Sequence, residues 1–167
     1  MKLKIQALSK ELDKKNFECG QVLLDNYIRK QAKQDVSRDL SACFVLVDDQ
    51  LIAKGYYTLS ASSINRDDFP DELRKKLPPA YIDLPTILLG RLAIEKSIQG
   101  KGYGEIMLYD ALKRSLEISQ RLGSLAVIVE PIDEKAKSFY ASYGFILLAG
   151  TGKMFIPMKT VKGLVSV

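Results

Sequence analysis

The chain of 167 residues contains no histidine. Imidazole is a frequent zinc ligand and the usual general base of serine and cysteine nucleophiles. Its absence excludes zinc–histidine sites and the Ser–His and Cys–His mechanisms, and we predict no metal site.

Cysteine is scarce as well, because only Cys19 and Cys43 are present. Without an export signal at the N-terminus, two cysteines indicate reduced thiols in a cytosol. No neighbouring residue in the sequence marks either thiol as activated, so both are expected to be inert side chains of the core.

Long apolar runs are also missing. No stretch approaches the ~20 residues of a membrane span, and the N-terminus lacks the apolar region of a signal peptide. We therefore expect a cytoplasmic protein without a membrane segment. The length suits one domain with a single core over residues 1–167.

The net charge of +5 is small but unevenly distributed. Residues 1–40 hold nine Lys and Arg against six Asp and Glu, and residues 121–167 hold six against three. This balance favours polyanions such as RNA, although a solvated surface with slight excess charge is the commoner origin of such numbers. Charge alone does not identify the partner.

The order of apolar patterns predicts an α/β protein with a mixed sheet and helices packed on its faces. The expected strands cover residues 3–8, 43–47, 51–60, 86–94, 125–129, 146–148 and 154–158.

Helices are expected over residues 22–34, 104–122 and 133–143. Residues 62–85 contain four prolines and are expected to form a partly irregular connection with a short helix over 71–76. The buried stripe of the first helix is expected to consist of Leu23, Leu24, Tyr27 and Ile28.

The most informative segment runs from Leu88 to Gly104, where an apolar strand leads through a glycine-rich turn into the long helix. Glycines leave backbone N–H groups accessible, and a helix N-terminus adds free N–H groups and a positive dipole end. This combination favours an anion, most naturally phosphate. A purely structural turn would also use glycine, so the motif alone leaves both interpretations open.

The spacing excludes two common phosphate loops. A nucleotide P-loop requires Gly, four residues and then Gly-Lys-Ser/Thr, which the chain lacks. A dinucleotide fingerprint starting at Gly100 would need glycine where Glu105 stands. The pattern that remains is Gln99-x-x-Gly102-x-Gly104.

A second pattern follows the apolar strand that ends at Pro131. Asp133 is placed to cap a short helix, in which Ala136, Phe139 and Tyr143 form one apolar face and after which Gly144 is a stop signal. The segment reads Ala-x-x-Phe-Tyr-x-x-x-Gly-Phe over residues 136–145.

Both patterns, in this order, resemble the signatures of the GNAT (GCN5-related) N-acetyltransferases, whose Gln/Arg-x-x-Gly-x-Gly/Ala loop binds the pyrophosphate of acetyl-CoA. Residues 17–20, 24–27, 55–60 and 89–94 are further similar to TacT/AtaT-type toxins of bacterial type II toxin–antitoxin systems. Those toxins acetylate the α-amino group of aminoacyl-tRNA and so block translation.

The resemblance implies the GNAT fold and acetyl-CoA as cosubstrate. It assigns the main chain of the central strand to the pantetheine and the thioester carbonyl, which places Leu92, Ala93 and Ile94 there. From the residues alone, Leu92 and Ile94 are equally core side chains. The pyrophosphate loop then consists of Gln99, Gly100, Lys101, Gly102, Tyr103 and Gly104.

Tyr140 matches the family tyrosine that protonates the departing CoA thiolate. A phenol with a reference pKa near 10 is protonated at neutral pH and can donate to a thiolate. Without the resemblance, a helix tyrosine packed beside Phe139 is the simpler interpretation.

No obvious general base is present. Glu130, at the end of its strand, could serve directly or through water, although a surface role fits equally well. An α-amine with a reference pKa of about 7.7–8.0 is partly neutral without help, whereas a lysine near 10.4 is not. This difference mildly favours an α-amine acceptor.

Five basic residues are candidate RNA contacts. Arg91 lies in the central strand and needs a partner, either a carboxylate or the phosphates of the acceptor. The other candidates are Arg29, Lys30, Lys33 and Arg38.

The resemblance also implies a ribbon–helix–helix antitoxin and a homodimer. The acceptor stays open: an aminoacyl-tRNA is the leading hypothesis, and a protein N-terminus, a small amine or an antibiotic is the alternative. A non-catalytic domain that binds CoA as a regulator is the hypothesis from another class.

Overall fold

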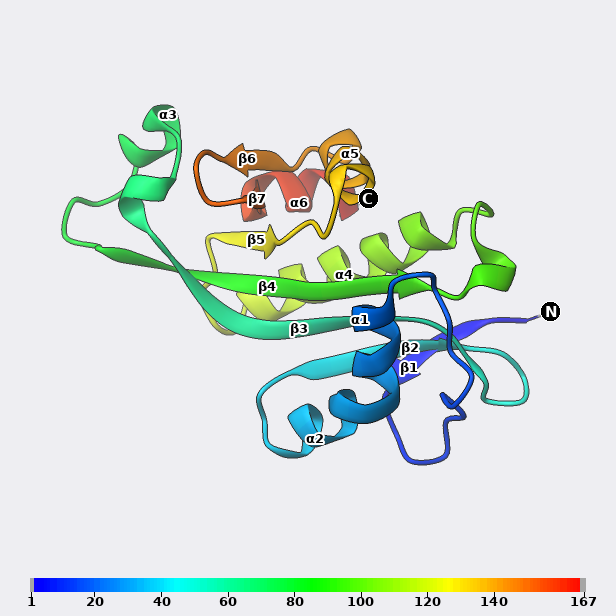
Figure 1. Ribbon diagram of the computed structural model, residues 1–167. Coiled ribbons are helices and arrows are strands. Elements are labelled where there is room, and N and C mark those ends of the chain that lie inside the picture. The colour runs from blue at the N-terminus through cyan, green and yellow to red at the C-terminus, as the bar shows by residue number, and fades with distance from the viewer. Residues whose placement is uncertain (1, 166–167) are drawn as a thin grey trace. The chain divides into compact units, whose positions relative to one another are not determined.

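Seven strands follow one another along the chain in the order that the apolar pattern predicts. The computed structural model describes residues 2–165. The strands form one mixed sheet in the order β1-β2-β3-β4-β5-β7-β6, with β4 and β5 parallel (Figure 1). Their bounds are β1 Lys4–Ala7, β2 Ala42–Val47, β3 Ala53–Asn65, β4 Asp83–Ile94, β5 Ala126–Val129, β6 Ile146–Leu148 and β7 Lys153–Pro157.

The helices lie between these strands and after the last one. A continuous helical segment consists of α1 (Val22–Asn26), the π turn η1 (Tyr27–Gln31) and α2 (Ala32–Ser37). The others are η2 (Arg66–Asp68), α3 (Asp71–Arg74), η3 (Lys96–Ile98), α4 (Tyr103–Ser119), α5 (Glu134–Ser142) and α6 (Met158–Val165). The predicted mixed sheet flanked by helices is therefore confirmed.

The chain divides into two compact units, each built from two separate stretches of the sequence. Unit 1 comprises the residues up to 60 together with 90–111, and unit 2 comprises 61–89 together with the residues from 112 onward. Strands β3 and β4 and helix α4 each contribute residues to both units.

In unit 1, β3 contacts a helix on each of its faces. Consecutive strand residues point to opposite sides, so the neighbours Tyr56 and Tyr57 reach different helices. The hydroxyl of Tyr56 donates to the Leu24 carbonyl oxygen in α1 over 2.7 Å. The hydroxyl of its neighbour Tyr57 donates to Asp110 Oδ2 in α4 over 2.6 Å. The core on the α1 side includes Tyr27, Ile28 and further buried apolar residues.

In unit 2, the connection between β3 and β4 is anchored by one arginine and one phenylalanine. The Arg66 guanidinium donates to main-chain carbonyl oxygens of Arg74, Leu77 and Pro78. The ring of Phe69 meets that of Phe155 edge-on at 5.3 Å. The connection is therefore held by Arg66 and packs against the core of unit 2 through Phe69, while most of its other residues are exposed.

Three expectations about the elements were wrong in detail. Leu23 is 76% exposed, because the buried face of the first helical segment runs through Leu24, Ile28 and Ala32 and leaves Leu23 beside it. The connection expected over 62–85 is shorter, since β3 continues to Asn65 and β4 begins at Asp83. The terminal helix α6 was not predicted.

In the long helix α4, Leu108, Ala111 and Leu112 are buried as expected, and Leu116 is half-buried. The short helix α5 begins as predicted, because Asp133 Oδ1 accepts from the Ala136 N–H over 2.8 Å.

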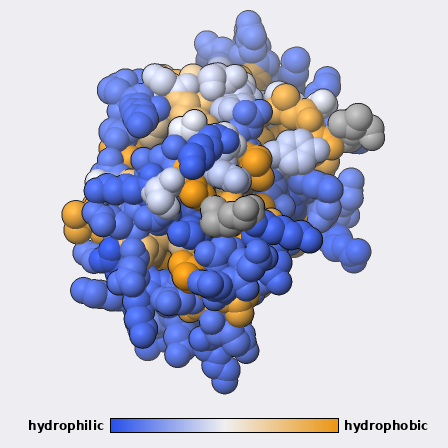
Figure 2. All heavy atoms as spheres, turned by 90° about the vertical axis from the view of Figure 1, so that its right-hand side faces the viewer, coloured by the Kyte–Doolittle hydropathy of each residue, from blue (hydrophilic) through white to orange (hydrophobic). Residues whose placement is uncertain are grey.

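No helix within residues 2–165 combines the length and the apolar character that crossing a membrane requires. Hydrophilic residues cover most of the face drawn in Figure 2, with hydrophobic residues in smaller groups between them.

Candidate active site

The glycine-rich turn lies in unit 1 between η3 and α4. Gly100 and Gly102 have φ values of +76° and +89°, in the left-handed region that favours glycine. A Cβ added at either position would have nothing within 4 Å. The glycines therefore relieve no crowding from the protein itself, and the space beside their main chain is open.

The amides of this turn are available to a ligand. Helix α4 begins at Tyr103, so its first-turn N–H groups lack intrahelical partners. Among residues 2–165, none accepts a hydrogen bond from the N–H of Gly100, Lys101 or Gly102. Clustered N–H groups at a helix N-terminus suit a phosphate. The geometry thus fits the predicted anion site, and the Lys101 side chain is exposed beside it.

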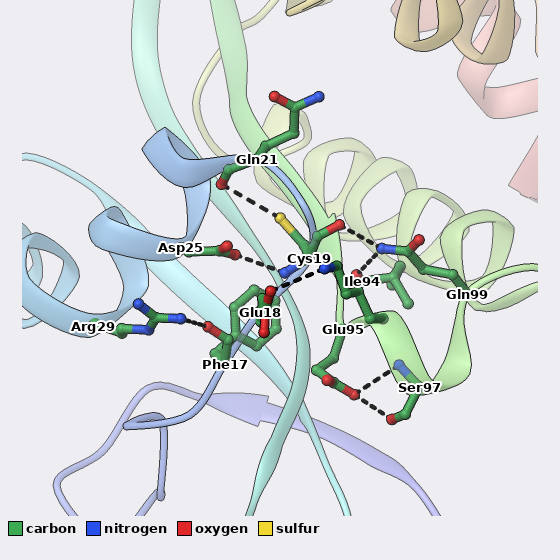
Figure 3. Close-up of polar contacts among 11 residues, drawn as sticks. Phe17, Glu18, Cys19, Gln21, Asp25, Arg29, Ile94, Glu95, Ser97 and Gln99 are labelled. Atoms are coloured by element: carbon green, nitrogen blue, oxygen red, sulfur yellow. Dashed lines mark hydrogen bonds and ion pairs between the residues drawn. The ribbon is translucent and has the colours of Figure 1, made fainter.

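Gln99, the first residue of the motif, anchors the turn with its side chain. Its Nε2 donates to the carbonyl oxygens of Cys19 and Ile94, each over 2.7 Å. Figure 3 shows this side chain reaching from the turn to the end of β4 and to the segment before α1. The motif spacing predicted a residue of the loop at position 99 but carried no signal of this anchoring role.

The segment Phe17–Cys19 is itself held on both sides. The Arg29 guanidinium donates to the Phe17 carbonyl oxygen, and Asp25 Oδ1 accepts from the Cys19 N–H over 2.7 Å. The Lys96 N–H donates to the Glu18 carbonyl oxygen over 2.8 Å. Sequence reasoning used this segment only as a point of resemblance. A carboxylate at Asp25, beside the predicted apolar stripe of the first helix, was the signal that could have drawn attention to it.

The end of β4 presents main-chain groups without a strand partner on one side. The register of β4 with β5 runs from Thr86 to Leu89, and β5 ends at Val129. Within the described residues, the β4 positions 90–94 therefore have no pairing partner in β5. Leu92 and Ile94 are half-buried and Ala93 is buried. Because these positions have no partner in β5, their main-chain groups on that side can bind a ligand even though the side chains pack in the protein.

Gly55 allows the close approach of β3 to this end of β4. A Cβ at Gly55 would lie 3.1 Å from the Ala93 carbonyl oxygen and 3.0 Å from the Ile94 Cδ1 atom. A residue with a Cβ at this position would require the Ala93 carbonyl oxygen or β3 to shift by a few tenths of an ångström.

Arg91 has a partner of a kind that the sequence did not indicate. Its guanidinium carbon lies 3.5 Å from the centre of the Tyr27 ring, a cation–π contact. The Tyr27 hydroxyl donates to Asp35 Oδ2 over 2.9 Å. Burial first, and then this hydrogen bond, raise the pKa of Tyr27 to about 12. Within the described residues, the partner of Arg91 is thus an aromatic ring, in place of the carboxylate that was one of its two expected partners.

Tyr140 differs from the other buried tyrosines of the described chain. Tyr27, Tyr56 and Tyr57 each donate a hydrogen bond from the hydroxyl, whereas none of residues 2–165 pairs with the hydroxyl of Tyr140. Buried tyrosines usually have a hydrogen-bond partner. Tyr140 is 7% exposed, and its ring meets Phe145 at 5.2 Å.

Burial raises the pKa of Tyr140. The phenol is therefore protonated across the neutral range, with an O–H that is free to donate. This is the state that a general acid needs.

The remaining candidates are simpler. Lys30, Lys33, Arg38 and Glu130 are exposed, whereas Arg29 is half-buried. No group of three or more metal-binding side chains occurs in the part of the chain that the structure describes. Burial raises the pKa of Cys19 to about 11 and that of Cys43 to about 12, in agreement with inert thiols.

Comparisons with known proteins identify the family of the chain. The acetyltransferase (GNAT) family model matches residues 7–145. The chain is 33% identical over 133 residues to a tRNA-acetylating toxin from Mycobacterium tuberculosis, with 80% of this chain and 78% of that protein covered.

Two solved structures are similar over almost the whole chain. AtaT complexed with acetyl-methionyl-tRNAfMet is 30% identical with a TM-score of 0.91, and the match covers 99% of this chain and 100% of that one. A tyrosine-to-phenylalanine variant of AtaT bound to the C-terminus of the antitoxin AtaR and acetyl-CoA is 27% identical with a TM-score of 0.83, covering 99% of each chain. By family model, sequence and fold, this chain belongs to the GNAT acetyltransferase family.

Proposed function

We propose that the protein is a toxin that transfers the acetyl group of acetyl-CoA to the α-amino group of an aminoacyl-tRNA and so blocks translation. The single observation that carries this proposal is the open, amide-lined turn at residues 99–102 in a chain so similar to tRNA-acetylating toxins. A non-catalytic CoA-binding domain would not require the unpaired hydroxyl of Tyr140.

Within this proposal, the main chain of Gln99, Gly100, Lys101, Gly102, Tyr103 and Gly104 binds the pyrophosphate of acetyl-CoA. Main-chain groups of Leu92, Ala93 and Ile94 bind the pantetheine and stabilise the thioester oxygen. Backbone donors suit this task because they are fixed before the charge develops. Acetyl-CoA supplies the activated acyl group.

Transfer forms one C–N bond and breaks one C–S bond. The neutral amine attacks the thioester carbonyl, the amine nitrogen loses a proton, and the CoA sulfur leaves as a thiolate. Tyr140 donates its phenolic proton to that thiolate. Because an α-amine is partly neutral at physiological pH, no strong base is required, and Glu130 or water takes the proton from the amine.

The RNA would contact exposed basic side chains, of which Lys30, Lys33 and Arg38 are the strongest candidates. Arg29 and Arg91 each have a partner within the chain, so their contribution to RNA binding would be indirect.

An antitoxin partner is part of the same proposal, supported by the AtaT variant bound to AtaR. We assign this partner a ribbon–helix–helix domain and the toxin a homodimeric state, acting as a single acetyltransferase domain over residues 1–167 in the cytoplasm, where charged tRNA is found. Light scattering is then expected to give a mass near twice the 18.7 kDa of the chain.

Incubation with labelled acetyl-CoA and total charged tRNA tests the function. The expected result is label in an N-acetyl-aminoacyl group that is released from the tRNA by base. Label only in added peptides or small amines would replace the tRNA by another acceptor. Acetyl-CoA binding without any transfer would favour the regulatory hypothesis.

A further inference from the structure

Unit 1 contains a pocket that the proposed catalytic chemistry does not use. It lies between the segment after β1 and helix α2, with a volume of about 320 Å³. A single water needs only about 10–15 Å³ of such space, so the pocket can hold a group far larger than water. None of the residues 91–104 lines it.

The pocket carries positive charge without a counter-ion. Lys10, Lys14 and Lys33 line it, and the structure gives none of them an ion pair with the described residues. Burial, with a contribution from nearby Lys33, lowers the pKa of Lys14. Three ammonium groups around one opening attract a negatively charged ligand.

A buried hydroxyl in the wall of the pocket also lacks a partner. Ser9 lines the pocket, and its Oγ atom is buried without any hydrogen bond to the described residues. The oxygen has almost no surface exposed to the pocket, so a ligand would reach it only if the wall moved. The lysines therefore define the chemistry that the pocket attracts, a carboxylate or phosphate oxygen.

The floor of the pocket is apolar, and this favours a carboxylate of a polypeptide over a free phosphate or a nucleotide. Leu8, Leu12 and Val36 line it, together with the carbon chains of the lysines. A phosphate alone would leave this surface wet, and a nucleobase would need an aromatic or planar neighbour, which is not among the lining residues. An apolar side chain flanked by carboxylates satisfies both the floor and the rim.

We propose that this pocket binds an acidic polypeptide segment, which inserts an apolar side chain between Leu8, Leu12 and Val36 and sets its carboxylates against Lys10, Lys14 and Lys33. Under the proposed toxin function, this segment belongs to the antitoxin. Only this identification of the partner rests on the proposed function. The pocket is then an anchoring point for the antitoxin outside the acetyl-CoA loop.

Fluorescence anisotropy with a labelled synthetic peptide of alternating Glu and Leu tests the site. The double variant Lys10→Glu/Lys14→Glu is expected to weaken binding roughly tenfold or more, because charge reversal turns attraction into repulsion. Ser37→Trp, at an exposed position of the lining, blocks the pocket and is expected to have a similar effect. The neighbouring exposed lysine, in Lys15→Glu, is the matched control and leaves binding unchanged.

An equal loss in Lys15→Glu, or equal binding of a peptide in which Gln replaces Glu, would contradict the proposal, because binding would then not depend on this pocket or on carboxylates. Displacement of the peptide by an oligouridylate but not by an unlabelled acidic peptide would assign the pocket to RNA instead. Acetylation of charged tRNA by the unmodified chain is measured separately, so a failure there leaves the peptide result intact.

Discussion

At the scale of single residues, hydrogen-bond partners distinguish three structural tyrosines from Tyr140, the proposed general acid. The hydroxyls of Tyr56 and Tyr57 join β3 to α1 and α4, and the hydroxyl of Tyr27 joins η1 to α2. The hydroxyl of Tyr140 makes no such bond within the described residues, although the side chain is buried. A buried ring whose hydroxyl has no partner among the described residues suits the proposed role of a general acid.

The first prediction concerns Tyr140→Phe. Because the substitution removes only the hydroxyl, we expect acetyl transfer to fall about 10²–10⁴-fold, the usual contribution of a general acid. Acetyl-CoA affinity and thermal stability should stay close to those of the unmodified chain. Single-turnover kinetics and calorimetry measure the two quantities. Tyr109→Phe, at an exposed tyrosine of α4, is the control, and full activity of Tyr140→Phe would remove Tyr140 from the mechanism.

The second prediction concerns the Cys19 thiol, which is half-buried and whose pKa is raised to about 11, first by burial and then by its interaction with Asp25. Only the thiolate reacts with iodoacetamide, so modification at pH 8 should be far slower than that of a free thiol and should rise as the pH approaches 11. Mass spectrometry after timed quenching follows the reaction. A fast reaction at pH 8 would show that the thiol is activated.

At the scale of elements, the sequence predicted best where its pattern was strong. The Asp133 cap, the strand before Pro131 and the glycine-rich turn were all placed correctly. The terminal helix α6 was missed. It contains two valines and a glycine, which favour helix weakly, and the burial of its apolar side depends on tertiary contacts.

The candidate site shows the same division. Spacing predicted the loop over residues 99–104, and the structure shows a local geometric reason for glycine at Gly100 and Gly102. The anchoring of Gln99 on Cys19 and the contact of Arg91 with Tyr27 join residues far apart in the sequence, and single-sequence patterns contain no information on such pairs.

The third prediction tests the backbone of the turn. Gly102→Ala meets no steric obstacle, but a left-handed backbone costs a residue with a Cβ roughly 1–2 kcal/mol. The turn should shift and acetyl-CoA affinity should fall roughly tenfold. Calorimetric titration provides the value. Gly123→Ala, where the added Cβ also meets nothing and no positive φ occurs, should bind acetyl-CoA normally.

The fourth prediction tests the Gln99 anchor. Gln99→Ala removes two hydrogen bonds, each contributing about 1 kcal/mol net, so the free energy of unfolding should fall by about 2 kcal/mol at most. Acetyl-CoA affinity should fall with it, since the turn loses its hold on β4. Chemical denaturation and calorimetry give the two values. Gln120→Ala, at an exposed position after α4, should change neither, and an unaffected affinity in Gln99→Ala would make the anchor irrelevant to the ligand.

At the scale of the whole molecule, stability should depend on pH through the buried tyrosines. The pKa of Tyr27 is about 12 in the folded chain against a reference of about 10. Its contribution to the free energy of unfolding is therefore complete below pH 10 and is lost as the pH rises towards 12.

The fifth prediction isolates this contribution with Tyr27→Phe, which keeps the ring beside Arg91 but removes the hydroxyl. The difference in the free energy of unfolding between the two chains should be constant below pH 10 and should shrink above it. Urea denaturation across the alkaline range measures this difference. A difference that grows with pH would mean that the pKa of Tyr27 is lowered by folding.

The claim on which the function depends is that the amides of residues 99–104 bind the diphosphate of acetyl-CoA. An NMR titration of the ¹⁵N-labelled chain tests it most directly, with CoA in one series and pantetheine, which lacks the diphosphate, in the other. We predict that the amide signals of Gly100, Lys101, Gly102, Tyr103 and Gly104 shift with CoA and stay in place with pantetheine. Saturating CoA binding that leaves these signals unmoved would contradict the account.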